Sequence, residues 1–558
     1  MTLSTQQDIA VGHPLFSDAS LALVQRDQGS LAAWQQALVG APLSCAASVT
    51  GDFAVGIRQV SGRTFLAVDR FATQPLCYRV GPDGLHFAQR ADALAGPNAE
   101  IDPQAIYDYL YFHMIPSPRT IFKDVFRLPA GHCALFENGQ LTVAPYWVPR
   151  FEEDRRPSFE DRRAEFRQLL DQAVLRRLDG SKPACFLSGG TDSSTVAGLI
   201  GKVGGRPAAT YSIGFDAAGY DEMQYARLAA KHFGAEHHEL YVTPKDLVQN
   251  IPDVAAHYDQ PFGNSSALPA YCCARMASDD GVTRLLAGDG GDELFGGNSR
   301  YAKQRIFGWY GAVPGPLRRG LLEPVFGMSG LAKLPLLGKG ASYIEQAKVP
   351  MPDRMQMYNL LLRLGVDEVL TADFRARVDG QSPLRQQREV WAAARTSDDL
   401  NRTLAYDWRY TLAESDLPKV CMTTALAGPS VAFPFLDDDL LAFSMRLPVQ
   451  DKLKGLQLRW FFKEALRGFL PDEIITKKKQ GFGLPFGVWV GQDAALGSLA
   501  KASLSSLATR NIVQPDFIRT LFEQRLPEHP GYYGEMVWIL MMLEQWLQHH
   551  APDYRLTA

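Results

Sequence analysis

One stretch, Cys185 to Ser194, restricts the possible folds of this chain more than any other. It reads Cys-Phe-Leu-Ser-Gly-Gly-Thr-Asp-Ser-Ser, which predicts a buried strand that passes through Gly189 and Gly190 into a helix ending near Val203. Glycines let a ligand approach the backbone closely, and the free N–H groups of a helix's first turn bind anions. The sequence therefore predicts a phosphate-binding turn between a strand and a helix.

This turn differs from two widespread phosphate-binding motifs, because it lacks both Gly-Lys-Ser/Thr and the spacing G-x-G-x-x-G. Its residues instead match the S-G-G-x-D-S-S pyrophosphate loop of the N-type ATP pyrophosphatases at every fixed position. The resemblance implies that ATP is split here into AMP and pyrophosphate; a strand-to-helix turn without a ligand is the alternative. The residues implied in binding the phosphates are Ser188, Gly189, Gly190, Thr191, Asp192 and Ser193.

Strand and helix patterns alternate on both sides of the turn. The apolar segments 208–215, 239–242 and 284–287 read as strands, and helical spacing of apolar residues marks segments such as 159–178 and 221–233. This order predicts an α/β fold with a parallel sheet that is covered by helices. In such sheets ligands gather at the carboxyl ends of the strands.

A second glycine turn runs from Leu286 to Gly297 and reads Leu-Ala-Gly-Asp-Gly-Gly-Asp-Glu-Leu-Phe-Gly-Gly. We expect its carboxylates to face the first turn, where Mg²⁺ would take one or two carboxylates together with phosphate oxygens. Asp192 and Asp292 are the predicted metal ligands, and both positions resemble the metal-binding aspartates of the asparagine synthetase family. The alternative is that Asp289, Asp292 and Glu293 only cap the turn and helix.

A third stretch, Thr476 to Pro485, contains three consecutive lysines followed by Gln-Gly-Phe-Gly-Leu-Pro. A lysine run alone is typical of a solvated surface. The residues after it resemble the R-x-K-x-G-F-G-x-P loop of the same family, which implies that Lys479 lies beside the α-phosphate. A cation held there would stabilise the charge that develops during adenylation.

Composition limits the class of protein. The chain has 558 residues, 46% of them apolar and 21% charged, with a net charge of −4, which argues against binding nucleic acid through a basic face. The longest apolar run, Met536 to Leu543, is too short to cross a membrane and predicts a packed C-terminal helix. Seven cysteines without a CxxC spacing, and no secretory pattern, favour reduced thiols in a cytoplasmic protein.

Residues 1–150 are predicted to form a separate β-rich domain, because short alternating segments are separated there by Gly, Asp and Pro turns. Stretches such as Ala67 to Tyr78 resemble the glutaminase domain of the asparagine synthetase family, an Ntn-type β-sandwich. That family uses a cysteine at its second residue, whereas this sequence has no cysteine before Cys45. We expect a catalytically silent domain, with Thr2 as an alternative nucleophile.

Residues 151–558 are predicted to form the adenylating domain, after a charged, proline-containing linker. Family members that bind free aspartate usually read K-V-D-R-x-S-M-A-H-S-L-E-x-R-x-P-F-L-D. Here the segment from Lys419 to Asp437 keeps both ends of that pattern, but Cys421, Ser430 and Ala432 replace charged residues. Because a charged substrate binds poorly without its ion-pair partners, we expect weak binding of free aspartate.

The silent glutaminase domain and the altered segment together resemble the lasso peptide cyclases. The resemblance implies that an Asp or Glu side chain of a precursor peptide is adenylated with Mg·ATP and then attacked by the peptide's N-terminal amine. A leader peptidase and a leader-binding protein are the implied partners. The aromatic-rich span Arg459 to Phe462 would shape the acceptor pocket, or simply pack in the core.

Adenine is expected near Leu187, Ile213 and Gly288, and Asp289 is the candidate base for the amine's proton. Three other functions stay open at this point. One is a glutamine-independent asparagine synthetase or an amidotransferase that acts on a sugar acid. The others are a small-molecule cyclase resembling β-lactam synthetase, and a non-catalytic scaffold or leader-binding protein that has kept the fold.

Overall fold

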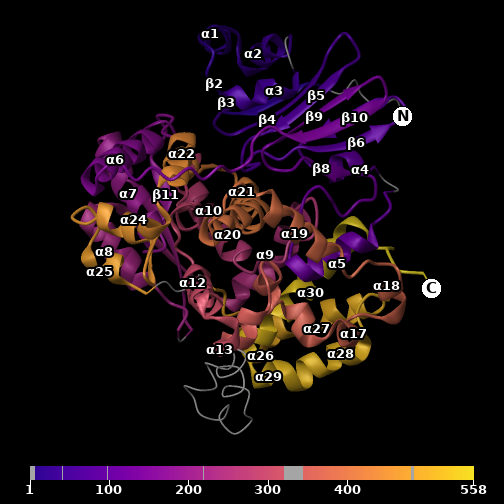
Figure 1. Ribbon diagram of the computed structural model, residues 1–558. Helices are drawn as coiled ribbons and strands as arrows, with labels where there is room; N and C mark the ends of the chain where they lie inside the picture. The colour runs from indigo at the N-terminus through magenta and orange to yellow at the C-terminus, as the bar shows by residue number, and fades with distance from the viewer. Residues whose placement is uncertain are drawn as a thin grey trace.

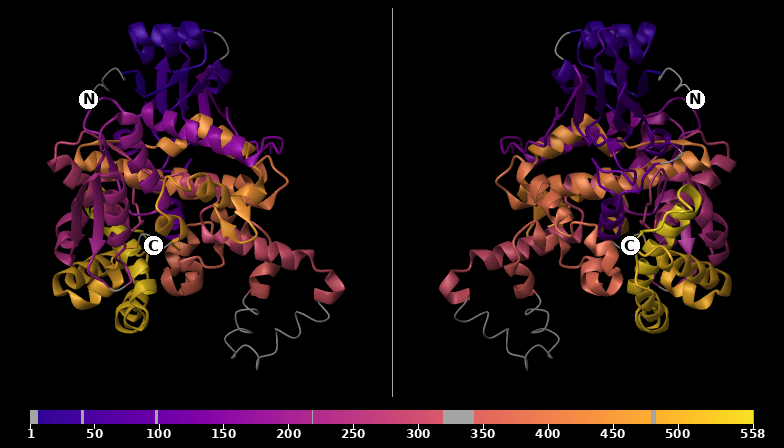
Figure 2. Two further views of the ribbon diagram at one scale, coloured as in Figure 1. Left: turned by 90° about the vertical axis from the view of Figure 1, so that its left-hand side faces the viewer. Right: turned by 90° about the vertical axis from the view of Figure 1, so that its right-hand side faces the viewer.

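The computed structural model describes residues 7–39, 42–96, 99–217, 219–318, 343–478 and 483–557, and Figure 1 shows the arrangement of their helices and strands. We call residues 1–150 the N-terminal part and residues 151–558 the C-terminal part. The strands of the N-terminal part lie at the top of Figures 1 and 2, above the C-terminal part. Both parts mix helices and strands, as expected for an α/β protein.

The N-terminal part is a sandwich of two antiparallel sheets. One sheet has the order β1-β4-β5-β9-β10, and the other has the order β7-β6-β8. Alternate residues of β4 point to opposite faces: Ala54 packs between the sheets with Leu66 and Phe87, whereas Phe53 packs against Trp34 on the outer face. The strands are β1 (Ile9–Gly12), β4 (Phe53–Arg58), β5 (Thr64–Val68), β6 (Cys77–Gly81), β7 (Gly84–Ala88), β8 (Phe126–Arg127), β9 (His132–Glu137) and β10 (Gln140–Pro145).

The C-terminal part contains a parallel sheet with the order β13-β12-β11-β14-β15. From β11 the chain first adds β12 and β13 on one side, and then returns to add β14 and β15 on the other. The point between β11 and β14 is therefore the topological switch point, where parallel sheets bind ligands. The strands are β11 (Ala184–Phe186), β12 (Ala209–Phe215), β13 (Glu236–Val242), β14 (Arg284–Leu286) and β15 (Ser430–Ala432).

Helices cover both faces of this sheet. Helices α6 (Phe159–Leu175), α7 (Thr191–Gly204) and α8 (Met223–Phe233) pack on one side, and α10 (Ala267–Asp279) packs on the other. Helix α6 begins at a capping box, in which the Ser158 hydroxyl accepts from the Asp161 N–H and the Asp161 carboxylate accepts from the Ser158 N–H.

The C-terminal helix α30 (Pro530–His550) forms the centre of the largest apolar core. Met536 to Leu543 are all at most 2% exposed, which confirms the packed helix expected from their sequence. Helix α5 (Pro103–Phe112) of the N-terminal part reaches this core, where the Tyr109 hydroxyl donates to the Ile539 carbonyl at 2.8 Å. Within the described residues, no helix is both long enough and apolar enough to span a membrane.

A buried ion pair fixes the end of α30. Glu544 accepts from Arg510 at 2.6 and 3.0 Å, and the two side chains are 0% and 4% exposed. Removing one partner leaves the other charge buried and unpaired, so Glu544→Ala should lower the free energy of unfolding by about 3 kcal/mol. Equilibrium urea denaturation measures this change. Replacing the exposed Glu523 with Ala is the control and should cost below about 0.5 kcal/mol; equal effects would contradict the prediction.

Candidate active site

The predicted phosphate-binding turn lies directly after β11. Gly189 has a φ of 68°, and a Cβ at that position would lie 2.6 Å from the Tyr225 Cβ, so glycine is needed where the turn packs on α8. Ser188 orders the turn, because its N–H donates to the Ser193 hydroxyl at 3.1 Å. Helix α7 then begins at Thr191. Its N-cap residue Gly190 has no side chain to cap the first N–H groups, and such groups are suited to bind phosphate oxygens.

The second glycine turn follows β14 and touches the first. A Cβ at Gly288 would lie 2.8 Å from the backbone nitrogen of Ser193, so the two turns meet through their backbones. Gly290, with a φ of 99°, then directs the chain into α11 (Gly291–Phe295), which carries Asp292 in its first turn. The adjacency of β11 and β14 thus brings together two turns that are about a hundred residues apart in the sequence.

Asp192 and Asp292 point toward the same position, as predicted. Both carboxylates form ion pairs with Arg459, whose Nη1 lies 2.7 Å from Asp292 Oδ1 and whose Nη2 contacts Asp192 Oδ1. Arg459 Nη1 also donates to the Thr191 hydroxyl at 2.8 Å. Two carboxylates that converge on one cation fit the oxygen-rich donor set that Mg²⁺ prefers. That they hold a metal stays a prediction.

A large cavity surrounds these groups and measures about 1020 Å³. All residues predicted to bind ATP, except Gly189, lie in its wall, and so does the candidate base Asp289. The wall residues predicted from the sequence are Leu187, Ser188, Gly190, Thr191, Asp192, Ser193, Ile213, Gly288, Asp289 and Asp292. The structure therefore gathers most of the predicted site residues in one cavity, while their individual roles stay predictions.

Asp289 lies beside a cationic side chain at another part of the cavity wall. Burial raises its pKa to about 6, although Lys419, with Nζ 3.9 Å away, opposes this shift. Lys419 also pairs with Asp416 at 3.0 Å; burial disfavours its charge, but these two carboxylates raise its pKa above the usual value. A carboxylate with a pKa of about 6 is suited to accept a proton near neutral pH.

Lys479 lies outside the described residues, so its predicted place beside the α-phosphate is untested. The first lysine of the same run, Lys477, is not a solvated surface residue, whereas Lys478 is exposed. Lys477 is 8% exposed at its side chain, pairs with Glu222 at 2.8 Å and lies 4.2 Å from the centre of the Tyr225 ring. Lys477 and Lys478 both line the cavity, which places the start of this loop at the site.

The altered segment from Lys419 to Asp437 reaches the large cavity only at its first two residues. Of the three substituted positions, none lines the large cavity, which instead receives Lys419 and Val420 from helix α21 (Leu417–Ala427). Cys421 lies on a different face of α21, with its Sγ 3.9 Å from the Thr73 carbonyl of the N-terminal part. Ser430 and Ala432 lie on β15, the edge strand, so their charge loss does not bear directly on a substrate in this cavity.

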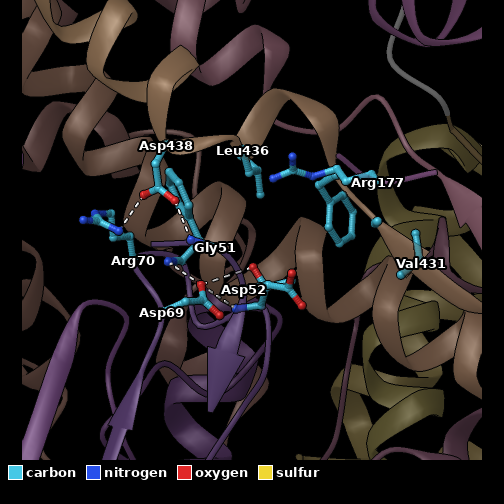
Figure 3. A pocket seen from close by; sticks show the side chains of 12 residues that line it. Gly51, Asp52, Asp69, Arg70, Arg177, Val431, Leu436 and Asp438 are labelled. Atoms are coloured by element: carbon cyan, nitrogen blue, oxygen red, sulfur yellow. Dashed lines mark hydrogen bonds and ion pairs between the residues drawn. The ribbon is translucent and has the colours of Figure 1, made fainter. Parts of the chain in front are cut away.

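Ala432 instead lines a small cavity of about 20 Å³ between the two parts of the chain, shown in Figure 3. Asp438 lines this cavity, forms an ion pair with Arg70 at 2.5 Å and accepts a hydrogen bond from the Gly51 N–H at 2.7 Å. Asp69 is fully buried there, and burial raises its pKa to about 6. A space of this size holds about one water molecule.

The aromatic-rich span confirms the packing alternative for most of its residues. Phe461 and Phe462 are 0% exposed in the core beneath α6, and Trp460 packs on Phe159. Arg459 is the exception, since it reaches the cavity and joins both predicted metal ligands. The sequence analysis did not predict this role of Arg459. The one sequence feature that pointed to it was that Arg459 shortly precedes a lysine-rich loop of the same cavity.

Replacing Asp289 should stabilise the protein at neutral pH. The pKa of Asp289 is about 3.8 in the unfolded chain and about 6 in the folded protein. Above pH 6 the folded protein must hold the ionised carboxylate, which lowers the free energy of unfolding. Below pH 4 the group is protonated in both states, and this penalty disappears. Asp289→Asn should therefore raise the free energy of unfolding at pH 7.5 by about 2 kcal/mol, since one pKa unit corresponds to about 1.4 kcal/mol and the group is partly exposed. The gain should shrink as pH falls through 6 toward 4.

Urea denaturation at several pH values measures this gain. Asp472→Asn is the control, because Asp472 is 73% exposed in a surface ion pair with Arg467 and should contribute little at any pH. A destabilised Asp289→Asn variant at pH 7.5 would instead mean that the contact with Lys419 outweighs the burial of the Asp289 charge.

Comparison with known proteins agrees with this geometry. The family model for Asparagine synthase matches residues 165–548, and the model for a Glutamine amidotransferase domain matches residues 32–147. Asparagine synthetase [glutamine-hydrolyzing] 1 of Bacillus subtilis is 24% identical over 86% of this chain and 74% of its own length. A putative asparagine synthetase of Mycobacterium tuberculosis is 26% identical over 87% of this chain and 74% of its own length.

A more distant relative is the amidase chry2 of Gibberella zeae, which is 24% identical over 71% of this chain and 63% of its own length. The Asparagine synthase match spans both glycine turns, Lys419 and Arg459, and thus the whole cavity described above. The chain belongs to the asparagine synthase family, whose members are ATP-dependent carbon–nitrogen ligases.

Proposed function

We propose that this chain is a lasso peptide cyclase. It activates an Asp or Glu side-chain carboxylate of a precursor peptide with ATP and joins it to the N-terminal amine of the same peptide. The new isopeptide bond closes a macrolactam ring, and AMP and pyrophosphate are released. The proposal is narrower than the family assignment and rests mainly on the size and lining of the cavity.

The cavity volume of about 1020 Å³ is the observation that carries this proposal. Typical small-molecule pockets measure about 300–1,000 Å³, so this space lies at the upper end of that range and leaves room beside a nucleotide. Leu456, Leu458 and Ile474 line part of the wall, and Leu456 is 46% exposed. An apolar, accessible wall suits a peptide that folds back on itself better than it suits a small zwitterion.

The thiols of the N-terminal part also favour an amine other than ammonia from glutamine. A nucleophilic cysteine is accessible and has a lowered pKa. Among the described residues, burial raises the pKa of Cys45 to about 12 and that of Cys133 to about 11, and Cys77 is fully buried. Thr2 lies outside the described residues. These cysteines are therefore unsuited to glutamine hydrolysis.

In the proposed mechanism, the N–H groups at the start of α7 bind the phosphates of ATP, and Asp192 and Asp292 would hold Mg²⁺. The metal would supply charge neutralisation on the phosphates. A substrate carboxylate oxygen attacks the α-phosphorus. The bond between this phosphorus and the oxygen that links it to the β-phosphorus breaks, and pyrophosphate leaves. The peptide amine then attacks the acyl carbon and AMP leaves with the bonding electron pair. Asp289 accepts the amine proton.

A leader peptidase and a leader-binding protein are proposed partners, because a precursor must be cut to expose its N-terminal amine before the ring closes. A cytoplasmic location is part of the same proposal, since it supplies ATP. The tests below use the full chain with Mg·ATP, so that they do not depend on either partner.

The deciding experiment offers two sets of substrates and measures pyrophosphate release together with the mass of the product. One set is a synthetic leader-free peptide with a free N-terminal amine and an internal Asp or Glu; the other is free aspartate with ammonia. The proposal predicts pyrophosphate release with the peptide and a product that has lost one water molecule. An N-acetylated peptide, and a peptide with the acceptor acid replaced by its amide, are the matched controls and should not cyclise.

Other outcomes identify the rival functions. Asparagine formed from aspartate and ammonia would indicate a glutamine-independent synthetase, and amide formation on a sugar acid would indicate an amidotransferase. Cyclisation of a small β-amino acid would indicate a β-lactam synthetase-like enzyme. No pyrophosphate release with any substrate would indicate a scaffold, and each of these results would overturn the proposal.

Two substitutions test the assigned roles. Asp192→Ala and Lys479→Ala should each reduce peptide-dependent pyrophosphate release by at least about a thousandfold, since each removes charge stabilisation from phosphoryl transfer. Thermal unfolding should show that both variants stay folded. Lys501→Ala, at an exposed position of helix α27 (Ala494–Ala508), is the control. Near-normal release by either variant would refute the role assigned to that residue.

A further inference from the structure

The guanidinium of Arg459 lies where the two predicted metal ligands converge. It pairs with Asp192 through Nη2 and with Asp292 through Nη1, and the second of these distances is 2.7 Å. Burial lowers the pKa of Arg459 to about 9, so the group is still charged at neutral pH. Arg459 thus supplies the positive charge that two neighbouring carboxylates require in a buried site.

The backbone is shaped to hold the arginine in this place. Arg459 has a φ of 56°, in the left-handed region, where a residue with a side chain costs about 1 kcal/mol or more. It is the residue before α24 (Trp460–Ala465), and its guanidinium carbon lies 4.2 Å from the centre of the buried Phe462 ring. A Cβ at Gly297 would clash with both the Asp292 carboxylate and the Arg459 Cδ, so glycine makes room for this ion pair.

A magnesium ion and this guanidinium compete for the same oxygen atoms. Mg²⁺ binds carboxylate oxygens at about 2.0–2.1 Å with near-octahedral geometry, which leaves no space for a guanidinium between the carboxylates. Arg459 must therefore move before both aspartates can bind a shared ion. Moving a buried cation away from two carboxylates is costly unless it gains another anionic partner.

The Arg459 Nε–H indicates what that partner is. It is buried and has no hydrogen-bond acceptor in the part of the chain that the structure describes. The side chain is 6% exposed and lines the same cavity as the free N–H groups at the start of α7. A planar guanidinium binds phosphate oxygens with two parallel hydrogen bonds, so a nucleotide phosphate would satisfy both Nε and one Nη.

We propose that Arg459 closes the metal site in the absence of nucleotide, and transfers from the two aspartates to a phosphate of ATP when Mg²⁺ enters with it. The metal is then bound as the nucleotide complex and not as the free ion. The inference concerns the phosphate end of the cavity and does not depend on which carboxylate or amine is joined.

Mn²⁺ binding, followed by electron paramagnetic resonance, tests this directly with the full chain. Wild-type protein should bind Mn²⁺ alone weakly, and at least tenfold more tightly with α,β-methylene-ATP, which cannot be cleaved between its α and β phosphates. Arg459→Met keeps an apolar stem over Phe462 and removes the guanidinium from both carboxylates. It should bind Mn²⁺ alone at least tenfold more tightly than wild type, but bind the analogue itself more weakly.

Two further variants distinguish competition between Arg459 and the metal from a general effect of positive charge in the cavity. Lys463→Met removes a cation from the same cavity that has no ion pair with either aspartate among the described residues, and it should change Mn²⁺ affinity by less than threefold. Arg459→Lys keeps the charge and should give an intermediate affinity. The proposal is overturned if Arg459→Met and Lys463→Met change the affinity for Mn²⁺ equally. It is also overturned if wild type binds Mn²⁺ equally well with and without the nucleotide analogue, a result that needs no variant.

Discussion

The contact between two glycine turns at neighbouring parallel strands is the constraint on which the whole site depends. Gly288 meets the backbone of Ser193, and a Cβ at Gly291 would lie 2.5 Å from the Asp192 carboxylate oxygen. Only residues without side chains allow the start of α7 and the start of α11 to approach so closely. This approach places both helix starts at the switch point of the sheet, where parallel sheets bind ligands.

Close approach of the turns creates an electrostatic problem that the structure solves with buried cations. Arg459 joins Asp192 to Asp292, and in another part of the cavity Lys419 joins Asp416 and approaches Asp289. Neighbouring buried carboxylates repel each other strongly without such partners. In the proposed exchange, Mg²⁺ would take over the carboxylate contacts of Arg459, and a nucleotide phosphate would become its new partner.

The sequence predicts what is local and misses what depends on distant packing. The strands before Ser188 and Gly288, and the glycine turns themselves, follow from short patterns, and the α/β fold follows from their order. Arg459 contacts Asp192 across 267 positions and adopts a left-handed conformation that no local pattern indicates for arginine. Likewise, substitutions at Cys421 and Ala432 can be read from the sequence, but the faces on which they lie cannot; both turn out to lie away from the large cavity.

The central claim is that both turns bind one metal–nucleotide complex. A crystal structure with Mn²⁺ and α,β-methylene-ATP, in which anomalous scattering locates the metal, tests it most directly. The account predicts phosphates at the start of α7 and one ion within about 2.2 Å of oxygens from both Asp192 and Asp292, with Arg459 moved onto a phosphate. Nucleotide bound elsewhere, or a metal held by neither aspartate, would contradict it.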